Sequence, residues 1–472
     1  MNWTSQIYEA MLLYPAKMAL WTPKQGRINF QEMASLCRRA QASLRRLGLK
    51  RGDSVLLLDL PGPRLYAAII AINSLGASVL FVEPWMPVAR INHVIQMVKP
   101  KIFWSPLLGQ AWALRIRSIR SIPQWVRPRF IDQVNDPQEF MSEVMDPHEL
   151  AILTFSSGTS GQPKGIPRTQ GYLQEVNALF RRYDTEVDTK PDLAIFANAV
   201  LYQLGRSRGT LLVPPSWSMR VLKQIAHLPR ELQAHTCTCG PAFLKRLMQT
   251  PGFEQLRWIG VGGALIDAPL LEEAFRRFPS VEFDIIYGST EVEPVAHAAA
   301  RLAVQKSRDA GHFQVLHLGQ AVPDIELDPQ PDTLWVSGVH VSPEYLTASD
   351  EDRRLKRRDA SGKLWHAMGD RIRVGDDGLW YQGRSFQKAE DFAAEQKIYE
   401  TLQHSACYIT RDHLDRPVLL GENIAQHRLT LQKIYPELAG IYETKIIRDK
   451  RHHARIDRTA SQRRWQGILR SS

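Results

Sequence analysis

The twelve residues TFSSGTSGQPKG, from Thr154 to Gly165, are the stretch of this chain that decides its fold. They combine five hydroxyl side chains, three glycines and one lysine, and they follow an apolar run at 149–153 that is typical of a buried strand. Backbone N–H groups and hydroxyls in such a stretch can close around an anion, and Lys164 adds a mobile positive charge. A Walker-type loop is excluded because Pro163 separates the glycine from the lysine. The stretch predicts a polyphosphate-binding loop that exposes Lys164, and an ordinary solvated loop is the alternative.

A second motif, FDIIYGSTE at residues 283–291, follows further along the chain. An apolar strand delivers an aromatic ring, a glycine, two hydroxyls and a carboxylate at its carboxyl end, which is the edge where open α/β sheets bind ligands. Tyr287 offers a stacking face for a purine, the hydroxyls can bond phosphate, and Glu291 could hold Mg²⁺. The alternative is a strand-end turn with a partly exposed tyrosine.

A third motif consists of MGD at residues 368–370 and GLWYQGR at residues 378–384. A carboxylate such as Asp370 can accept both hydroxyls of a ribose, and Arg384 can pair with phosphate or carboxylate. A β-hairpin with a polar turn is the alternative interpretation of these residues.

In this order and spacing the three motifs resemble those of the adenylate-forming superfamily, which includes acyl-CoA synthetases, peptide-synthetase adenylation domains and luciferases. The turn LGLKRGD at 47–53 and the glycine-rich turn at 262–264 are similar to further family motifs. The resemblance implies that Tyr287 stacks on adenine, Thr290 contacts the α-phosphate and Glu291 ligates Mg²⁺. It also implies that Asp370 binds the ribose and that Arg384 lies at the edge of an interdomain hinge.

The site residues that follow from the motifs and the resemblance form two groups. The predicted catalytic residues are Lys164, Thr290, Glu291 and Arg455, with Glu291 also the metal ligand. The predicted nucleotide-binding residues are Thr154, Ser156, Ser157, Gly158, Thr159, Ser160, Gly161, Gly263, Ala264, Tyr287, Gly288, Ser289, Asp370 and Arg384.

Within the superfamily the chain most resembles fatty-acyl ligases and the β-lactone synthetases of olefin pathways. The segments similar to the latter are VEP at 82–84, PKIFW at 100–104, the basic stretch at 111–120 and the basic segment at 449–458. It departs from the family pattern in several places. Arg455 stands where the family has a closing catalytic lysine, and Phe386 where the hinge is usually Asp or Lys. The C-terminal lid is shorter than usual, and the usual Pro and His of the acyl-site segment are not evident at 196–202.

The alternation of helical periods and short apolar runs predicts an α/β fold. With 472 residues, roughly two to four domains are expected. We predict a large N-terminal AMP-binding domain of layered sheets and helices at 1–384 and a small α+β lid at 385–472. The predicted helices are 30–47, 64–75 and 270–277, and the predicted strands are 54–58, 77–82, 149–153, 194–200, 211–213, 236–239, 258–261 and 283–286.

The formal net charge of +11 is concentrated in two basic clusters, one between Arg115 and Arg129 and one between Lys445 and Arg470. A solvated basic face, an anionic membrane surface or an acidic carrier protein would each suit such clusters. No nucleic-acid motif accompanies the charge, so nucleic-acid binding is not expected. Four cysteines make no disulfide framework, and Cys237 and Cys239 are expected to be buried structural thiols. A cytoplasmic protein without signal peptide or membrane span is expected.

We therefore expect an ATP- and Mg²⁺-dependent ligase that converts a carboxylic acid, with a fatty acid favoured, to an acyl-adenylate and pyrophosphate. Coenzyme A or a phosphopantetheine carrier protein would then accept the acyl group. Residues 199–202, Trp217 and the turn at 262–265 are candidates for an apolar acyl slot. One alternative is β-lactone formation from a 3-hydroxy acid. The other is a nucleotide-binding protein with degenerate adenylation activity, which the departures at Arg455 and Phe386 motivate.

Overall fold

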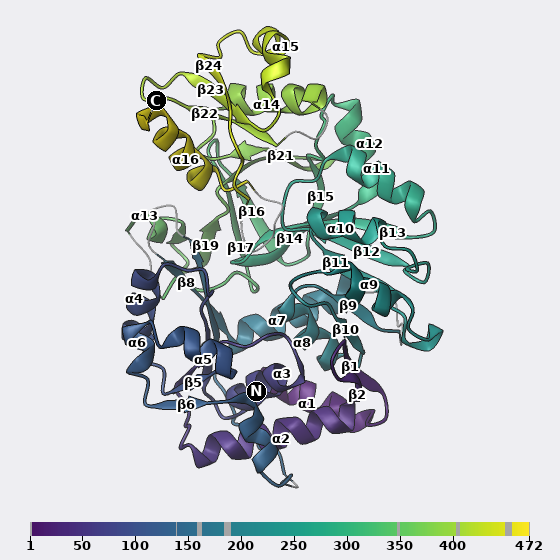
Figure 1. Cartoon of the computed structure of the whole chain (residues 1–472), viewed down its shortest axis with the longest axis vertical. Helices are drawn as coiled ribbons and strands as arrows, with labels where there is room; N and C mark the ends of the chain where they lie inside the picture. The colour runs from purple at the N-terminus through teal and green to yellow at the C-terminus, as the bar shows by residue number, and fades with distance from the viewer. Residues whose placement is uncertain are drawn as a thin grey trace.

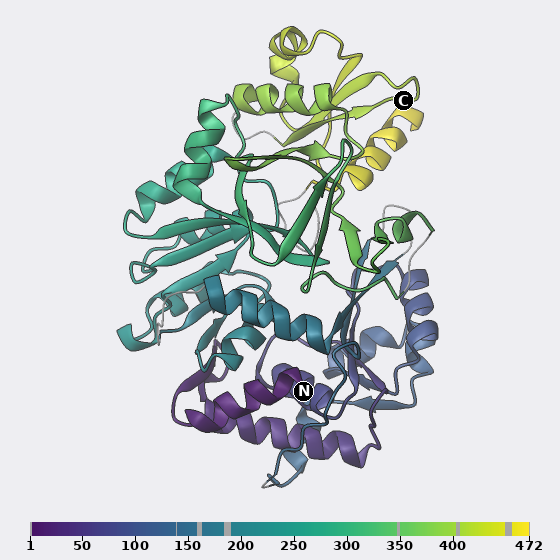
Figure 2. The same ribbon diagram turned by 180° about the vertical axis from the view of Figure 1, so that it is seen from behind.

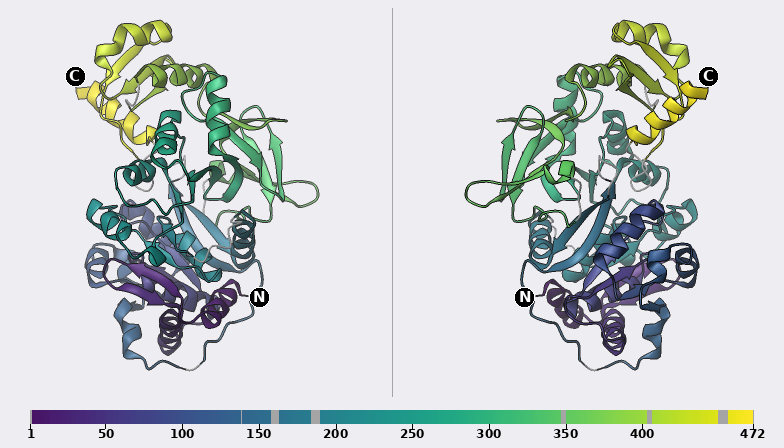
Figure 3. Two further views of the ribbon diagram at one scale, coloured as in Figure 1. Left: turned by 90° about the vertical axis from the view of Figure 1, so that its right-hand side faces the viewer. Right: turned by 90° about the vertical axis from the view of Figure 1, so that its left-hand side faces the viewer.

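The computed structural model describes residues 2–137, 139–157, 163–183, 190–346, 350–402, 406–448 and 456–471. A large layered body contains the N-terminal part of the chain, and a small C-terminal part packs at one end of it (Figures 1 and 3). Seen from behind, the strands between about residues 315 and 385 lie between the two (Figure 2).

The first large sheet of the body is covered by helices on both faces. Among the described residues it has six strands in the order β6-β5-β3-β4-β7-β8, with the bounds Gln124–Val126, Ile102–Trp104, Ser54–Leu57, Ser78–Phe81, Leu150–Ser157 and Pro163–Thr169. All pairs are parallel except β7 with β8. Successive strand residues point to opposite faces, so Leu57 packs with α1–α3 and Leu56 with α4–α6. Burial on both faces is the usual condition of a parallel sheet.

The six helices of this sheet divide evenly between its faces. On the inner face lie α1 (Trp3–Leu13), α2 (Phe30–Arg46) and α3 (Pro63–Ser74), and on the outer face α4 (Val88–Val98), α5 (Leu107–Ala113) and α6 (Arg117–Arg120). The start of α2 is set locally by a capping box, in which Asn29 Oδ1 accepts from the Glu32 N–H and Glu32 Oε2 accepts from the Asn29 N–H, both at 2.7 Å.

The second large sheet packs behind the inner helices. Within the described ranges it has eleven strands in the order β2-β1-β10-β9-β11-β12-β13-β14-β15-β21-β20, with the bounds Gly26–Asn29, Met18–Thr22, Thr210–Leu212, Asp192–Ala194, Thr236–Cys239, Trp258–Gly262, Glu282–Ser289, Val292–Ala299, His317–Ala321, Gly378–Arg384 and Asp370–Gly375. The pairs from β1 to β13 are parallel, and those from β13 to β20 are antiparallel.

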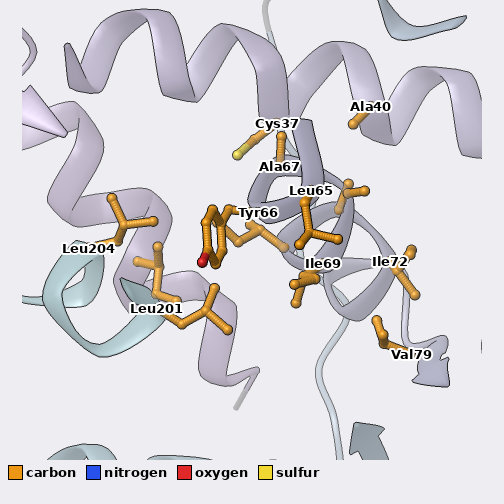
Figure 4. Close-up of a cluster of buried hydrophobic side chains, with 14 of the residues drawn as sticks. Cys37, Ala40, Leu65, Tyr66, Ala67, Ile69, Ile72, Val79, Leu201 and Leu204 are labelled. Carbon is orange, nitrogen blue, oxygen red and sulfur yellow. The ribbon is translucent and has the colours of Figure 1, made fainter. Parts of the chain in front are cut away.

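Two further sets of helices enclose this second sheet. The helices α7 (Gln170–Tyr183) and α8 (Ala197–Gly205) join α1–α3 between the two sheets, whereas α9 (Met219–Ala226), α10 (Pro241–Met248), α11 (Ala268–Arg277) and α12 (Ala300–Asp309) cover the far face. Figure 4 shows the shared inner layer, where Tyr66 of α3 lies near Leu201 and Leu204 of α8. The body is therefore built from helix, sheet, helix, sheet and helix layers.

A smaller sheet and the C-terminal part complete the described chain. The smaller sheet has the order β16-β17-β19-β18 (Ile325–Pro329, Leu334–Gly338, Leu364–Ala367 and Lys356–Arg358), and α13 (Asp350–Arg353) precedes β18. The C-terminal part contains α14 (Ala389–Leu402), β22 (Cys407–Arg411), β23 (Pro417–Gly421), α15 (Arg428–Ile434), β24 (Gly440–Glu443) and α16 (Arg458–Ser471). The short 3₁₀ helices are η1 (Pro128–Gln133), η2 (Arg230–Leu232) and η3 (Ala425–His427).

Helix α14 contributes to two cores. Its Phe392 joins the body cluster and meets Tyr381 edge-on with ring centroids 5.6 Å apart. Its Ile398 belongs instead to the core of the C-terminal part. Gln396 Nε2 also donates to Gln314 Oε1 of the body at 2.9 Å. Strand β21 ends at Arg384 and α14 begins at Ala389, so the connection between them is short.

The predicted α/β class is confirmed, as are the three predicted helices and all but one of the predicted strands. The strand predicted at 194–200 is wrong: β9 ends at Ala194, and α8 begins at Ala197. Its apolar run is buried on one helical face instead, which periodicity does not distinguish from a short buried strand. Cys237 and Cys239 are buried on β11 as free thiols. Across the part of the chain that is described, we find no helix with the length and apolar character needed to cross a membrane.

Candidate active site

The first motif forms a β-hairpin arm rather than an exposed loop around its lysine. Strands β7 and β8 pair antiparallel, with Ser156 opposite Lys164. Lys164 is only 7% exposed, and its Nζ lies 5.5 Å from the centroid of the Tyr345 ring. The prediction of an exposed Lys164 is therefore wrong, because an aromatic side chain 181 positions later covers it. The predicted residues Gly158, Thr159, Ser160 and Gly161 lie outside the described residues, and only the backbone of Ser156 and Ser157 is described.

An unpredicted arginine joins this arm to the second motif. Arg168 of β8 is buried, and its Nη1 donates to Thr154 Oγ1 at 2.6 Å. Its Nη2 donates to the carbonyl oxygen of Thr290 at 3.4 Å. Burial alone would lower the pKa of Arg168, but Tyr172 and Glu293 outweigh it and raise the pKa. The guanidinium therefore stays charged and holds two of the predicted residues in one place.

The second motif lies at the end of β13, next to the glycine-rich turn. Gly262 of β12 is opposite Ile286, and a Cβ on Gly262 would come within 2.5 Å of the Ile286 carbonyl oxygen. Gly263 follows with φ +80°, a conformation that favours glycine. A Cβ on Gly288 would meet the Val292 carbonyl oxygen at 2.6 Å. The turn that carries Ala264 and the segment that carries Tyr287 are therefore brought together by close backbone approach.

The third motif is the hairpin β20–β21, and it pairs its two predicted side chains. Asp370 and Arg384 are opposite one another in the strand register, and Arg384 Nη1 lies 2.9 Å from Asp370 Oδ1. Tyr287 Oη donates to Asp370 Oδ2 at 2.9 Å. Asp370 raises the pKa of Arg384, while burial and the nearby carboxylate raise the pKa of Tyr287. One buried carboxylate thus organises this end of the site, which we call the ribose end.

The other end of the site gathers five charged or polar side chains, and we call it the phosphate end. Tyr345 Oη donates to Glu291 Oε1 at 2.9 Å. Lys356 is 9% exposed, with its Nζ 5.4 Å from the Tyr345 ring centroid and hydrogen-bonded to Ser342 O at 2.5 Å. The phosphate end consists of Lys164, Glu291, Tyr345, Lys356 and His366.

The phosphate end keeps Glu291 ionised although it is enclosed. Burial would raise the pKa of Glu291, but His366, Lys356, the hydrogen bond from Tyr345 and Lys164 together lower it. Burial lowers the pKa of Lys356 to about 7, against the partial opposition of Glu291. Burial and Lys356 lower the pKa of His366 to about 3, so its ring is neutral near pH 7. Near pH 7 the anionic Glu291 therefore faces Lys164 and a partly protonated Lys356, a set of basic side chains that suits a phosphate chain.

The residues present fit a nucleotide and a magnesium ion. Ser289 Oγ is buried beside Thr290 and, within the described ranges, has no hydrogen-bond partner, so it is available to a phosphate oxygen. Magnesium is commonly held by one or two carboxylates together with substrate phosphates, and Glu291 can supply such a carboxylate. The described residues contain no cluster of three or more His, Cys, Asp or Glu that would hold a metal without phosphates.

Three further predictions concern Arg455, Phe386 and the apolar acyl slot. Arg455 lies outside the described residues. Phe386 is exposed in the connection between β21 and α14. The apolar acyl slot is not assembled as predicted, because Val200 and Leu201 pack in the layer between the sheets while Trp217 packs against Phe243 on the far face. A sheet separates the two groups.

Sequence reasoning missed Arg168, Tyr345, Lys356 and His366. Two weak signals were present in the sequence: Arg168 follows Lys164 by four residues, and His366 precedes Asp370 by four. No local pattern marks Tyr345 or Lys356, which reach the site because the small sheet packs against the turn that carries Glu291. The backbone N–H of Ser342 donates to the Glu291 carbonyl oxygen at 2.8 Å at this junction.

Comparisons with known proteins identify the family of this chain. The AMP-binding enzyme family model matches residues 8–346. The hybrid PKS-NRPS synthetase TAS1 of Gloeophyllum trabeum is 26% identical over 398 residues, which are 79% of this chain and 25% of that protein. Phenyloxazoline synthase MbtB of Mycobacterium tuberculosis is 23% identical over 392 residues, which are 76% of this chain and 26% of that protein. The chain therefore spans about a quarter of the length of these two relatives.

Solved structures share the whole arrangement at low identity. A fatty acyl CoA synthetase of Mycobacterium tuberculosis superposes with a TM-score of 0.74 at 15% identity, covering 99% of both chains. O-succinylbenzoate coenzyme A synthetase of Bacillus subtilis, in complex with AMP, superposes with a TM-score of 0.77 at 16% identity, covering 97% of both chains. Because the family match spans well over half of the sequence, this chain belongs to the AMP-binding enzymes and has the fold of the adenylate-forming ligases.

Proposed function

We propose that this protein activates a carboxylic acid with ATP, forming an acyl-adenylate and releasing pyrophosphate. The observation that carries the proposal is the two-ended site, with the Tyr287–Asp370–Arg384 group at one end and the Lys164–Glu291–Tyr345–Lys356 group at the other. The first end suits a ribose and the second suits a phosphate chain. Membership of the AMP-binding family supports the same reaction.

In this proposal the side chains bind and orient rather than react. Asp370 accepts the ribose hydroxyls, Tyr287 presents its ring to the adenine, and the backbone at Gly263 and Ala264 lines the base. Ser289 and Thr290 contact the α-phosphate, and Lys164 meets the negative charge of the phosphates. A magnesium ion held by Glu291 and the phosphates would neutralise charge on the pyrophosphate that leaves. Catalysis by positioning and charge stabilisation needs no protein nucleophile.

The reaction conserves its atoms without a further reactant. A carboxylate oxygen of the acid attacks the α-phosphorus of ATP, and the bond between the α-phosphorus and the bridging oxygen of the β-phosphate breaks. The electron pair of that bond leaves with pyrophosphate. Lys164, buried against Tyr345, is held where a fixed positive charge costs little reorganisation during the reaction.

The lid roles are part of the proposal. We assign residues 1–384 to an N-terminal AMP-binding domain and residues 385–472 to a short lid, because the C-terminal part has a core of its own around Ile398 and Leu419. Arg455 would replace the closing lysine of the family. Arginine keeps the charge but is larger and favours two-point contacts, so we expect slower adenylation than with lysine. Arg455→Lys should then retain or improve the rate, and Arg455→Ala should lose it.

The acyl substrate and the acceptor each have more than one candidate. A fatty acid is the favoured substrate, supported by the sequence resemblance and by the shared fold with a fatty acyl CoA synthetase. The relative named as a hybrid PKS-NRPS synthetase supports a carrier-protein thiol as acceptor, with coenzyme A as the other candidate. A 3-hydroxy fatty acid closing to a β-lactone is the alternative outcome at the same site.

The decisive experiment is ATP–pyrophosphate exchange with a panel of aliphatic, 3-hydroxy, aromatic and amino acids. We expect exchange that depends on the acid and on Mg²⁺. Product analysis with coenzyme A, a phosphopantetheine carrier or no acceptor would then separate thioester from β-lactone. Nucleotide binding without exchange for any acid would contradict the enzyme and favour the degenerate, nucleotide-binding alternative that Arg455 and Phe386 motivate.

A further inference from the structure

Residues 84–131 form an uninterrupted segment without a single aspartate or glutamate. The segment contains six arginines and two lysines, which are most of the net charge of +11. It folds into β5 and β6 at one edge of the six-stranded sheet and into α4, α5 and α6 on the outer face of that sheet, along one flank of the body (Figure 1). Its arginines are Arg90, Arg115, Arg117, Arg120, Arg127 and Arg129.

Five arginines of this flank face solvent, whereas Lys101 of the same segment pairs with Asp53 at 3.0 Å. Arg115, Arg117 and Arg120 are exposed around α6, and Arg127 and Arg129 are exposed at the end of β6. None of these five makes an ion pair with another described residue. Arginines elsewhere on the body surface do pair, as Arg38 does with Asp136 at 2.6 Å. The flank therefore presents uncompensated positive charge.

Apolar side chains project from the same flank. On α5 and its C-terminal cap, Leu107, Leu108 and Leu114 are 59%, 86% and 59% exposed. Leu107, Ala111 and Leu114 follow one another at i, i+4 and i+7, so the solvent-facing side of this helix is apolar. Its other side is anchored, because Ala113 lies in the outer core cluster with Ile116 and Ile119. Surface helices normally show the reverse pattern.

We infer that this flank, defined by Leu107, Leu108, Leu114, Arg115, Arg117 and Arg120, binds the surface of an anionic lipid bilayer. Projecting leucines that neighbour arginines are the arrangement of an interfacial helix, whose apolar face enters the headgroup region while cations meet acidic lipids. Trp85, exposed before α4 in the same segment, adds a residue type enriched at that interface. A bilayer is favoured over a protein partner because the leucines stand out from the surface: Leu108, at 86%, is the most exposed large apolar side chain in the described part of the chain. The inference is independent of the adenylation reaction.

Co-sedimentation of the full chain with vesicles tests this assignment. We expect binding to vesicles of phosphatidylcholine mixed with phosphatidylglycerol, little binding to pure phosphatidylcholine, and weaker binding as salt increases. Arg115→Gln/Arg117→Gln/Arg120→Gln should weaken binding on the order of 100-fold, since each basic residue near an anionic surface contributes about fivefold. Leu107→Ser/Leu108→Ser should also weaken binding, at unchanged net charge.

Two control variants test whether a loss of vesicle binding is specific to this flank. Arg220→Gln/Arg230→Gln/Arg276→Gln removes three exposed arginines from the opposite flank, around α9 and α11 (Figure 1). Leu429→Ser removes an 82% exposed leucine from the C-terminal part. Both controls should bind vesicles as the wild type does, and all variants should keep the wild-type thermal transition.

Three outcomes would overturn the assignment. The first is no binding of the wild type to anionic vesicles, which would leave an acidic protein as the partner for this flank. The second is equal loss in the flank variants and in the opposite-flank control, which would make the attraction a property of net charge alone. The third is full retention by Leu107→Ser/Leu108→Ser, which would exclude insertion of the helix.

Discussion

At the ribose end, Tyr287, Asp370 and Arg384 come from β13, β20 and β21, which belong to one sheet. At the phosphate end, the contributing residues come from three sheets: Lys164 from β8, Glu291 from the β13–β14 turn, and Lys356 and His366 from β18 and β19. The ribose end is organised around one carboxylate with two partners. The phosphate end places two lysines around one carboxylate and one tyrosine.

The two ends of the site are held in place by different features of the fold. Hydrogen-bonded strands hold the ribose end through register, since Asp370 is directly opposite Arg384. Packing between sheets holds the phosphate end, with Tyr345 as the side chain that contacts both lysines and the carboxylate. Substitutions at the phosphate end should therefore change catalysis and the local charge balance together, whereas those at the ribose end should change nucleotide affinity.

The largest effect is expected at Lys164. Lys164→Met keeps the buried stem and removes the charge, and it should lower acid-dependent pyrophosphate release by roughly 10²–10³-fold, the scale for losing one electrostatic donor. Steady-state assays at saturating ATP would measure this. Lys223→Met, at an exposed position on α9, serves as control. Wild-type turnover in Lys164→Met would show that Lys164 has no role in the reaction, and it would weaken the assignment of the phosphate end.

Asp370→Asn tests the ribose end. A hydrogen bond to a charged acceptor is worth about 1.5–3 kcal/mol, so the KM for ATP should rise roughly 10–100-fold while kcat changes less. The wild type should discriminate strongly against 2′,3′-dideoxy-ATP, and the variant should not. Tyr287→Phe is the companion variant, because it removes the hydroxyl that donates to Asp370 but keeps the ring. If Asp370→Asn discriminates against 2′,3′-dideoxy-ATP as strongly as the wild type does, the carboxylate does not bind the ribose and only holds Arg384 in place.

Tyr345→Phe should have a smaller effect that acts through Glu291. Loss of the 2.9 Å hydrogen bond frees the Glu291 carboxylate to rotate. Removing a residue that hydrogen-bonds a metal ligand lowers metal affinity by at least about 10-fold in typical cases. The Mg²⁺ concentration for half-maximal activity should rise by that order. Glu291→Gln should raise it further, and the double variant should resemble Glu291→Gln alone. Additive effects of the two substitutions would show that Tyr345 acts independently of Glu291.

The last prediction concerns stability and its pH dependence, rather than activity, at Lys356. Its pKa falls from an ordinary 10.5 to about 7 because of burial. Between these values the unfolded chain holds a proton that the folded chain has released, so the free energy of unfolding rises with pH across this window. The cost of burying the ammonium is fully present below pH 7. Relative to Lys356→Met, the wild type should gain at most about 1.4 kcal/mol per pH unit.

Denaturant unfolding of both proteins at several pH values would measure the slope. Below pH 7 the variant should be the more stable protein, and the difference should shrink as the pH rises toward 10. Lys223→Met should follow the wild type at every pH. Parallel curves for wild type and Lys356→Met would mean that Lys356 stays protonated in the fold, and would make the phosphate end more strongly cationic than we describe.

Much of the fold and about half of the site could be predicted from the amino-acid sequence. The strands at Ser54–Leu57 and Trp258–Gly262 and the helix Phe30–Arg46 follow from local periodicity, caps and turns. Residues 197–200 were predicted wrongly as part of a strand, because an apolar run on a buried helix resembles one. The roles of the phosphate-loop glycines and of Arg455 remain predictions, since these residues lie outside the described ranges.

The sequence by itself determined the chemistry of the motifs: a hydroxyl- and glycine-rich stretch with Lys164, the carboxylates Glu291 and Asp370, and Arg384 at a fixed spacing. Those signals are local, because each motif is a few residues of one strand or turn. Only the tertiary structure decided that Lys164 is covered, that Tyr345 and Lys356 join Glu291, and that Leu108 projects among unpaired arginines. Such contacts arise where separate sheets and helices pack, and no spacing along the chain encodes the distance between them.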